Sequence, residues 1–367
     1  MEKLHRVCKN FTRHDKKTRT ILLCEMLEYT NVFLEAAFRA EGYSFETLKN
    51  PVKDRTLALR NLLQRVLYRM AEQGQTEYAQ IPVISLNLMG EEKHTGFRIT
   101  PGLLSGGIAA GCYGDLIMCL YQQVKPYEQN PGETDRIRSQ VEKKLCESIR
   151  RHRNGRHTRE KNYRYACEVF SKVPVKPGKK KRVGITGEIY MKYSKLGNDD
   201  IESFLLRQGM EPYSGGFVNY CLYLVDTERY KAEKYQHNPI MVKACAFVLH
   251  RLCEAQKHLL TVIGETDRFQ TDLPFPELKE KVQGILAEGC NTGDGWLIAA
   301  EVIQYVEKGC GSVLILHPFG CLVSHVCERG ILQRLHARFP DVSIQTIEYD
   351  YDQSKTLRES RILLGIS

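Results

Sequence analysis

The sequence lacks the short motifs that mark the commonest cofactor-binding enzymes. It contains no Gly-x-x-x-x-Gly-Lys-Ser/Thr phosphate loop, no Gly-x-Gly-x-x-Gly dinucleotide fingerprint and no Gly-x-Ser-x-Gly nucleophile turn. Each of these motifs places backbone N–H groups or a nucleophile at the end of a strand, so its absence counts against that class of reaction. The chain is therefore not expected to be an autonomous nucleotide hydrolase, a standard dinucleotide dehydrogenase or an α/β-hydrolase.

Signals for membrane insertion and secretion are also missing. No apolar run approaches the roughly 20 residues that a membrane-spanning helix needs. The first 17 residues are too charged for a secretory signal. We therefore expect a cytoplasmic protein that has no membrane partner.

Cysteine is plentiful, but the common cysteine motifs are absent. The chain has 13 cysteines and no Cys-x-x-Cys pair, which argues against a zinc ribbon and a thioredoxin-type site. An odd number of dispersed cysteines without a secretion signal also argues against a disulfide framework. Most of these thiols are expected to behave as small buried hydrophobic groups.

Positive charge is concentrated in one middle segment. The net charge of the chain is +9, yet residues 136–182 alone carry a net +13. Solvated helices are the commoner explanation of such a segment. Docking to an acidic protein or to the phosphates of coenzyme A is the alternative. Nucleic acid is not an expected partner, because few aromatic residues interleave with the basic ones.

The order of predicted elements indicates an α/β protein. Strand-like runs at 20–24, 44–48, 82–88, 182–188, 312–317 and 343–349 alternate with helical patterns, which include 55–72, 136–151, 160–170, 276–287 and 323–338. Such alternation predicts two stacked Rossmann-like three-layer domains with mostly parallel sheets. The predicted boundaries are 1–130 for an N-terminal domain, 131–181 for a basic helical segment and linker, and 182–367 for a C-terminal domain.

Candidate site residues lie on loops that follow strand-like or helix-like units of the C-terminal domain, and an open α/β sheet places its chemistry beyond the carboxyl ends of its strands. Glu188 and His325 are the candidate acid/base groups. Cys321 and Cys290 are the candidate metal ligands, because a thiolate is stabilised near a helix N-terminus. The candidate cofactor-binding residues lie on the same loops: Gly293, Asp294, Gly295, Phe319 and Gly320.

Each of these residues also has a plainer interpretation. Gly293 to Gly295 can form a tight turn into a helix that buries Trp296. Cys321 can be a buried thiol, and His317 and His325 can be packed polar side chains. The acidic turn after the last strand, with Ser354 behind it, is more typical of helix capping than of catalysis.

Taken together and in order, several stretches resemble one family. They match the C-terminal, non-ATPase portion of the CoA-substrate-specific activase proteins, which are related to 2-hydroxyacyl-CoA dehydratase subunits and to double-cubane iron–sulfur proteins. The matching stretches are residues 20–23, 34–43, 82–87, 96–100, 113–116, 126–128, 131–132, 183–190, 293–296, 318–322 and 324–325.

The resemblance implies an oxygen-sensitive iron–sulfur cluster held by cysteines and reduced by an ATP-hydrolysing activase. Dehydratase members of the family eliminate water from 2-hydroxyacyl-CoA, and double-cubane members carry out difficult reductions. This chain departs from the pattern between Leu48 and Ile81, where two cysteine motifs of the family are missing. The ATPase half of the activase proteins is missing as well.

Three hypotheses follow. In the first, the chain is a divergent, auxiliary or degenerate component of an ATP-driven low-potential electron-transfer system. In the second, it is an active iron–sulfur reductase or dehydratase component with an altered or intersubunit cluster. In the third, it is a metal-free protein that binds acyl-CoA or another small molecule. An activase-type protein is the expected partner in the first two, and a homo- or hetero-dimer is consistent with all three.

Overall fold

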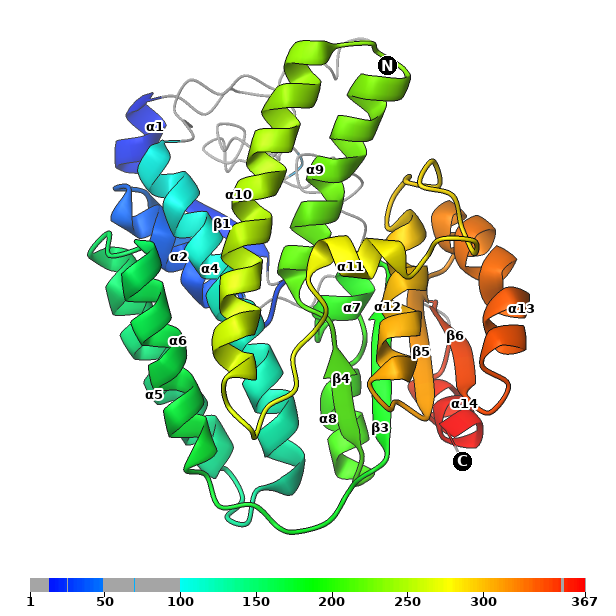
Figure 1. The fold of residues 1–367 in the computed structure, drawn as a ribbon. Coiled ribbons are helices and arrows are strands. Elements are labelled where there is room, and N and C mark those ends of the chain that lie inside the picture. Colours follow the sequence, from blue (N-terminus) through cyan, green and yellow to red (C-terminus); the bar gives the residue numbers. More distant parts are fainter. Residues whose placement is uncertain (1–12, 25, 49–68, 70–99, 351–352, 367) are drawn as a thin grey trace.

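A computed structural model describes residues 13–24, 26–48, 69, 100–350 and 353–366. The described chain is an α/β protein with two sheets, and every strand pair in both sheets is parallel. Figure 1 shows the smaller sheet among helices of the N-terminal half and the larger sheet beside the C-terminus. The predicted α/β class and the parallel pairing are confirmed.

The N-terminal half begins with the predicted β-α-β unit. After α1 (Arg13–Thr18), β1 (Thr20–Cys24) leads through α2 (Asn31–Ala40) to β2 (Ser44–Leu48), and the two strands pair in parallel. The predicted strand at 82–88 lies outside the described residues, and so does the predicted helix at 55–72 apart from Arg69.

Helix α4 (Pro101–Val124) is the central element of the N-terminal half, and the short turn η3 (Lys125–Tyr127) extends it. By length and composition it could cross a membrane, which the sequence analysis did not anticipate, but 67% of its most apolar window is buried in the protein. Its glycines allow helix α2 to approach closely. A Cβ atom at Gly114 would stand 2.1 Å from the Thr30 hydroxyl oxygen. This is the packing of a core helix.

Thr100 caps the start of α4. Its hydroxyl accepts a hydrogen bond from the Leu103 N–H at 2.9 Å and donates one to Glu41 at 2.6 Å. We expect Thr100→Ala to lower the free energy of unfolding by about 1 kcal/mol, the usual loss for a helix N-cap. Urea denaturation measures this change. Thr100→Ser keeps the hydroxyl and should stay within about 0.5 kcal/mol of the wild type; an equal loss in both variants would argue against the cap.

The basic middle segment forms two helices, α5 (Glu133–Arg150) and α6 (Arg156–Ser171), as predicted. The apolar side of α5, including Ile137, Val141 and Leu145, is buried in the core. Helix α5 packs on α2 and α4, and α6 packs on α4 and α10 (Pro239–Gly264). Many of the basic side chains lie on the outer surface of these helices. The segment therefore packs into the N-terminal half and also connects it to the C-terminal half.

The larger sheet contains β3 (Arg182–Gly187), β4 (Glu211–Ser214), β5 (Ser312–Pro318) and β6 (Ser343–Tyr349) in the order β4-β3-β5-β6. Residues on one face pack with α7 (Ile189–Tyr193), α8 (Ile201–Arg207) and α14 (Lys355–Ile366). The other face meets α12 (Gly295–Glu307) and α13 (Arg329–Arg338). This half thus has the three layers that the alternating pattern predicted.

Several elements of the C-terminal half differ from expectation. The predicted helix at 276–287 is shorter, because α11 (Phe275–Glu280) gives way to turns that include Gly284 at φ +79°. The predicted helix at 323–338 begins with a π-helical turn, η4 (Ser324–Glu328). Helix α9 (Phe217–Lys234) and strand β4 were not predicted.

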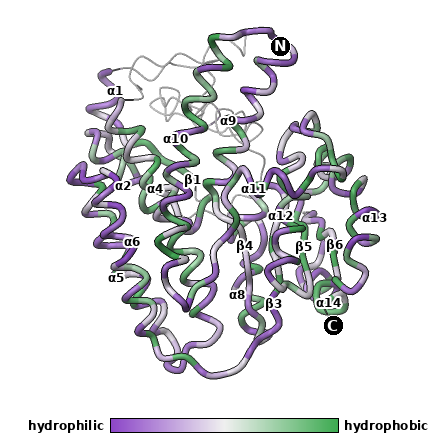
Figure 2. Tube along the Cα trace, viewed as in Figure 1, coloured by the Kyte–Doolittle hydropathy of each residue, from purple (hydrophilic) through white to green (hydrophobic). Residues whose placement is uncertain are grey.

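Helices α9 and α10 form a hairpin that extends beyond the larger sheet (Figure 1). Figure 2 colours much of α10 as hydrophobic, although the first half of this helix is largely exposed. Phe247 is 67% exposed and Ile240 is 80% exposed. The second half of α10 packs into the larger hydrophobic core. This core is one connected cluster of buried side chains, with members from Tyr29 in the N-terminal half to Ile344 in the C-terminal half.

Candidate functional site

The candidate site lies at the carboxyl edge of the larger sheet. After β3, the chain forms β4 on one side of β3, and it later forms β5 on the other side of β3. An open parallel sheet binds ligands at such a switch point, beyond the carboxyl ends of its strands. Here β3 ends at Gly187 beside Glu188, and β5 ends at His317 and Pro318.

The Gly-Asp-Gly turn sits at this edge and starts α12. Gly293 and Gly295 have φ values of +59° and +29°, and a Cβ at Gly295 would stand 2.1 Å from the Cys290 carbonyl oxygen. The Trp296 N–H donates to that carbonyl at 2.9 Å, and the indole is buried. The plainer interpretation, a tight turn into a core helix, is therefore confirmed. It does not remove the cofactor-binding prediction, because α12 still directs its N-terminus toward this edge.

Two cysteine-bearing loops meet at this edge. A Cβ at Gly293, three residues after Cys290, would stand 2.8 Å from a methyl carbon of Val323, two residues after Cys321. Cys290 and Cys321 are both partly exposed. The two loops therefore lie close together in the structure.

Cys327 is a third thiol at the same place, and the sequence analysis missed it. It is partly exposed within η4. Burial raises its pKa, and the nearby Cys290 raises it further. The only sequence signal for Cys327 was that it follows Cys321 by six residues, within the predicted helix at 323–338. The edge therefore carries three partly exposed thiols.

Phe319 and Gly320 shape the turn that precedes Cys321. Gly320 has a φ of +66°, and the Cys321 N–H donates to the Pro318 carbonyl at 3.2 Å. The Phe319 ring is 60% exposed at the rim of the site. These two residues position Cys321, and their predicted contact with a cofactor stays a prediction.

Four carboxyl groups lie near one another beside these loops: Asp294, Glu188, Glu328 and Glu301. Burial raises the pKa of Asp294 well above its usual range, and the negative charges of Glu188, Glu328 and Glu301 act in the same direction. Burial raises the pKa of Glu328 to about 7, while the Ser324 hydroxyl opposes the shift. Neither carboxyl oxygen of Glu328 has a hydrogen-bond partner of good geometry, and the residue is fully buried.

Glu188, the candidate acid/base, has a structural partner. Its carboxylate accepts hydrogen bonds from the N–H groups of Tyr190 and Met191, both at 3.1 Å, and so caps α7. Its catalytic role stays a prediction.

His325, the other candidate acid/base, belongs to a group of possible metal ligands. One donor atom from each of His317, His325 and Glu348 lies within 4.8 Å of the other two. His317 and Glu348 are directly paired across β5 and β6, so both side chains project from the same face of the sheet. The sequence analysis noted His317 beside His325, but it did not identify Glu348.

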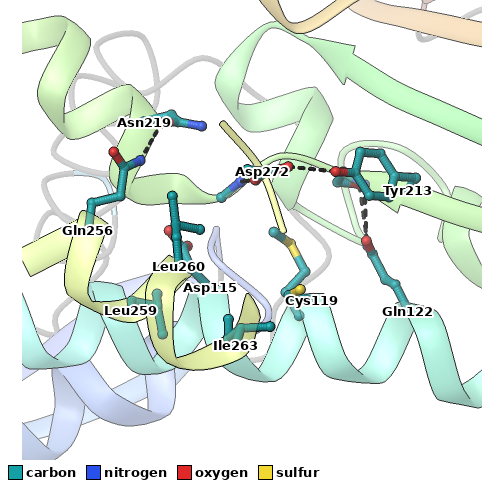
Figure 3. Close-up of a pocket in the computed structure, with 13 residues that line it drawn as sticks. Asp115, Cys119, Gln122, Tyr213, Asn219, Gln256, Leu259, Leu260, Ile263 and Asp272 are labelled. Atoms are coloured by element: carbon teal, nitrogen blue, oxygen red, sulfur yellow. Dashed lines mark hydrogen bonds between the residues drawn. The ribbon is translucent and has the colours of Figure 1, made fainter. Parts of the chain in front are cut away.

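A polar junction joins the two halves of the protein. Asp115 on α4 accepts from the N–H groups of Phe217 and Val218, at 2.7 and 3.0 Å. Burial raises the pKa of Asp115 to about 7, and the nearby charge of Asp272 adds to the shift. Asp272 in turn accepts from the Tyr213 hydroxyl at 2.7 Å (Figure 3).

The cavity beside this junction has a volume of about 30 Å³. That is room for about two water molecules, and it is far too small for an acyl-CoA. Figure 3 shows Gln122, Asn219 and Gln256 among its lining residues, each in a hydrogen bond with a neighbour. The junction therefore holds the two halves together and is a weaker candidate for substrate binding than the sheet edge.

No family model, no curated protein and no solved structure matches this chain.

Proposed function

We propose that this chain is an auxiliary, cytoplasmic component of an ATP-driven low-potential electron-transfer system, akin to the activase-associated iron–sulfur proteins it resembles. We propose further that its two halves are stacked Rossmann-like domains. The observation that supports this role most is the contact between the Cys290 and Cys321 loops at the carboxyl edge of the parallel sheet.

The residues at this edge fit an iron–sulfur cluster in part. Thiolates are the ligands that such clusters require, usually four of them. Cys290, Cys321 and Cys327 are partly exposed at the edge, and the N-terminus of α12 supplies backbone N–H groups and a positive dipole end. A fourth ligand would come from a second subunit or from a non-protein group.

The chain's own residues would orient and shield this group. Gly293 and Gly295 hold the first loop in left-handed turns, and Gly320 does the same for the second. Exposed apolar side chains at the rim, Phe319 and Leu322, would form part of the surface that meets an activase-type partner. The cluster, when bound, would supply one-electron redox chemistry.

Docking of an acyl-CoA to the basic linker is a separate proposal. Arg182 is already paired with Glu211 at 2.7 Å, so it is not a free phosphate ligand. Lys179 is exposed and Lys180 is half-buried; these two are the residues to neutralise in a binding assay.

Anaerobic reconstitution with iron and sulfide tests the cluster. We expect bound iron and sulfide with visible and EPR signals in the wild type, and a loss of at least half of the bound iron in Cys321→Ser. Cys245→Ser, on the distant part of α10, is the matched control and should bind as much iron as the wild type. A colourless wild-type protein, or equal iron in all three, would contradict the proposal.

A further inference from the structure

We propose that His317, His325 and Glu348 bind a single divalent transition-metal ion, at a site separate from the thiols. The three donor atoms already lie within 4.8 Å of one another. They come from three neighbouring elements, β5, η4 and β6, at the carboxyl edge of the sheet. The site thus goes beyond the cluster proposed above, which uses sulfur ligands on the adjoining loops.

His317 is the strongest sign that the site takes a ligand. It is 1% exposed, and neither of its ring nitrogens has a hydrogen-bond partner of good geometry. A buried polar group without a partner is rare and asks for an explanation such as an ion. The ring packs edge-on against the His325 ring, with 5.4 Å between centroids, and one of its nitrogens lies within 4.8 Å of the donor atoms of His325 and Glu348.

The environment of His317 also suits metal binding. Burial lowers its pKa, which keeps the imidazole neutral near pH 7. Neutral imidazole is the form that coordinates a metal.

His325 is held with one nitrogen free for the metal. Its Nδ1 lies 2.8 Å from the Cys321 carbonyl oxygen, which can only accept a hydrogen bond. Nδ1 must therefore carry the proton, and the lone pair of the neutral ring is on Nε2. That nitrogen is 3.5 Å from Oε2 of Glu348. A backbone carbonyl that fixes the tautomer in this way is the usual second partner of a metal-bound histidine.

Arg329 serves as the counter-ion of Glu348 in the metal-free protein. Its Nη2 lies 3.1 Å from Oε2 of Glu348, one helical turn after His325. The guanidinium is half exposed, so it can swing into solvent when a metal ion takes its place. Arg329 therefore competes with the metal for the carboxylate and should weaken the binding of any cation.

The donor set selects the class of metal. Two imidazoles and one carboxylate suit Zn²⁺, Fe²⁺ and Co²⁺ better than Mg²⁺ or Ca²⁺, which prefer oxygen ligands. Tetrahedral zinc ligands stand about 3.4 Å apart at the usual bond lengths of about 2.1 Å. The 3.5 Å between His325 and Glu348 matches this spacing. Three protein ligands leave at least one coordination position open for water or substrate.

Titration of the chelator-treated full chain with Co²⁺ tests the site, because Co²⁺ bound by nitrogen ligands gives a visible spectrum. We expect one Co²⁺ per chain, displaced by Zn²⁺. His325→Ala and Glu348→Gln should each weaken binding at least a hundredfold. His336→Ala, at an exposed position on α13, is the matched control and should bind as the wild type does. Absence of binding, or equal affinity in all variants, would overturn the proposal.

Two further variants separate this site from its neighbours. Arg329→Gln should tighten Co²⁺ binding at least threefold, and an unchanged affinity would overturn its role as a competing cation. Cys321→Ser removes the thiol but keeps the backbone carbonyl that orients His325, so its Co²⁺ affinity should stay within twofold of the wild type. A large loss in Cys321→Ser would instead assign the bound Co²⁺ to the thiol site.

Discussion

Lys192→Met is expected to destabilise the protein by about 3–5 kcal/mol, the usual loss when one partner of a buried ion pair is removed. The Lys192 ammonium lies 2.7 and 2.8 Å from the two carboxylate oxygens of Glu301, and both side chains are almost fully buried. Thr186, at the end of β3, donates to the same carboxylate at 2.6 Å. The variant would leave Glu301 charged in the core. Urea denaturation monitored by circular dichroism measures the change.

Two comparisons make this test specific. The double variant Lys192→Met/Glu301→Gln removes both charges and should recover a large part of the loss, since an uncharged pair no longer leaves a buried ion. Lys172→Met breaks an exposed pair with Glu168, in which both side chains are more than 60% exposed, and should change stability by at most about 1 kcal/mol. Equal effects of Lys192→Met and Lys172→Met would contradict the burial argument.

Glu328→Gln is expected to make the stability of the protein less dependent on pH. Burial raises the pKa of Glu328 from 4.5 to about 7, so the folded state binds the proton more tightly than the unfolded state. The stability contributed by that proton is fully present below pH 4.5 and is lost as pH rises through 7. The loss is on the order of 3 kcal/mol by pH 8, since one pKa unit corresponds to about 1.4 kcal/mol.

The measurement compares the free energy of unfolding of wild type and Glu328→Gln at pH 5 and pH 8. From pH 5 to pH 8, the free energy of unfolding of the wild type should fall by roughly 2 kcal/mol more than that of the variant. A loss of stability caused by burying the amide is the same at both pH values and cancels in this comparison. Glu277→Gln, at an exposed position on α11, should show no such gain. A pH-independent difference between wild type and Glu328→Gln would mean that Glu328 does not titrate in this range.

Much of the fold was predictable because its signals are local. The strands at β1, β2, β3, β5 and β6 are apolar or alternating runs bounded by turn residues, and α5 and α6 show a clear helical repeat. Strand β4 was missed because it has four residues, including Pro212, which is unusual within a sheet. Helix α9 was missed because its apolar pattern is interrupted by polar residues that are buried here, such as Asn219 and Asp226.

The site was predictable only in part, because its parts meet through tertiary structure. Cys321 and His325 follow a strand in the sequence and Gly293 to Gly295 precede a helix, and the structure brings them to one edge. Glu348 could not be identified, since it becomes a neighbour of His317 only through the register of β5 and β6. The π-helical turn that carries His325 has no signature in the sequence, although such turns are frequent at functional sites.

Anomalous X-ray diffraction from one crystal of the full chain, reconstituted with iron and sulfide and then soaked in Co²⁺, tests most directly whether the chemistry lies at the carboxyl edge of β3, β5 and β6. We predict an iron peak beside Cys290, Cys321 and Cys327, and a cobalt peak between His317, His325 and Glu348. Peaks confined to other parts of the molecule, or no bound metal at all, would contradict the assignment of this edge as the functional site.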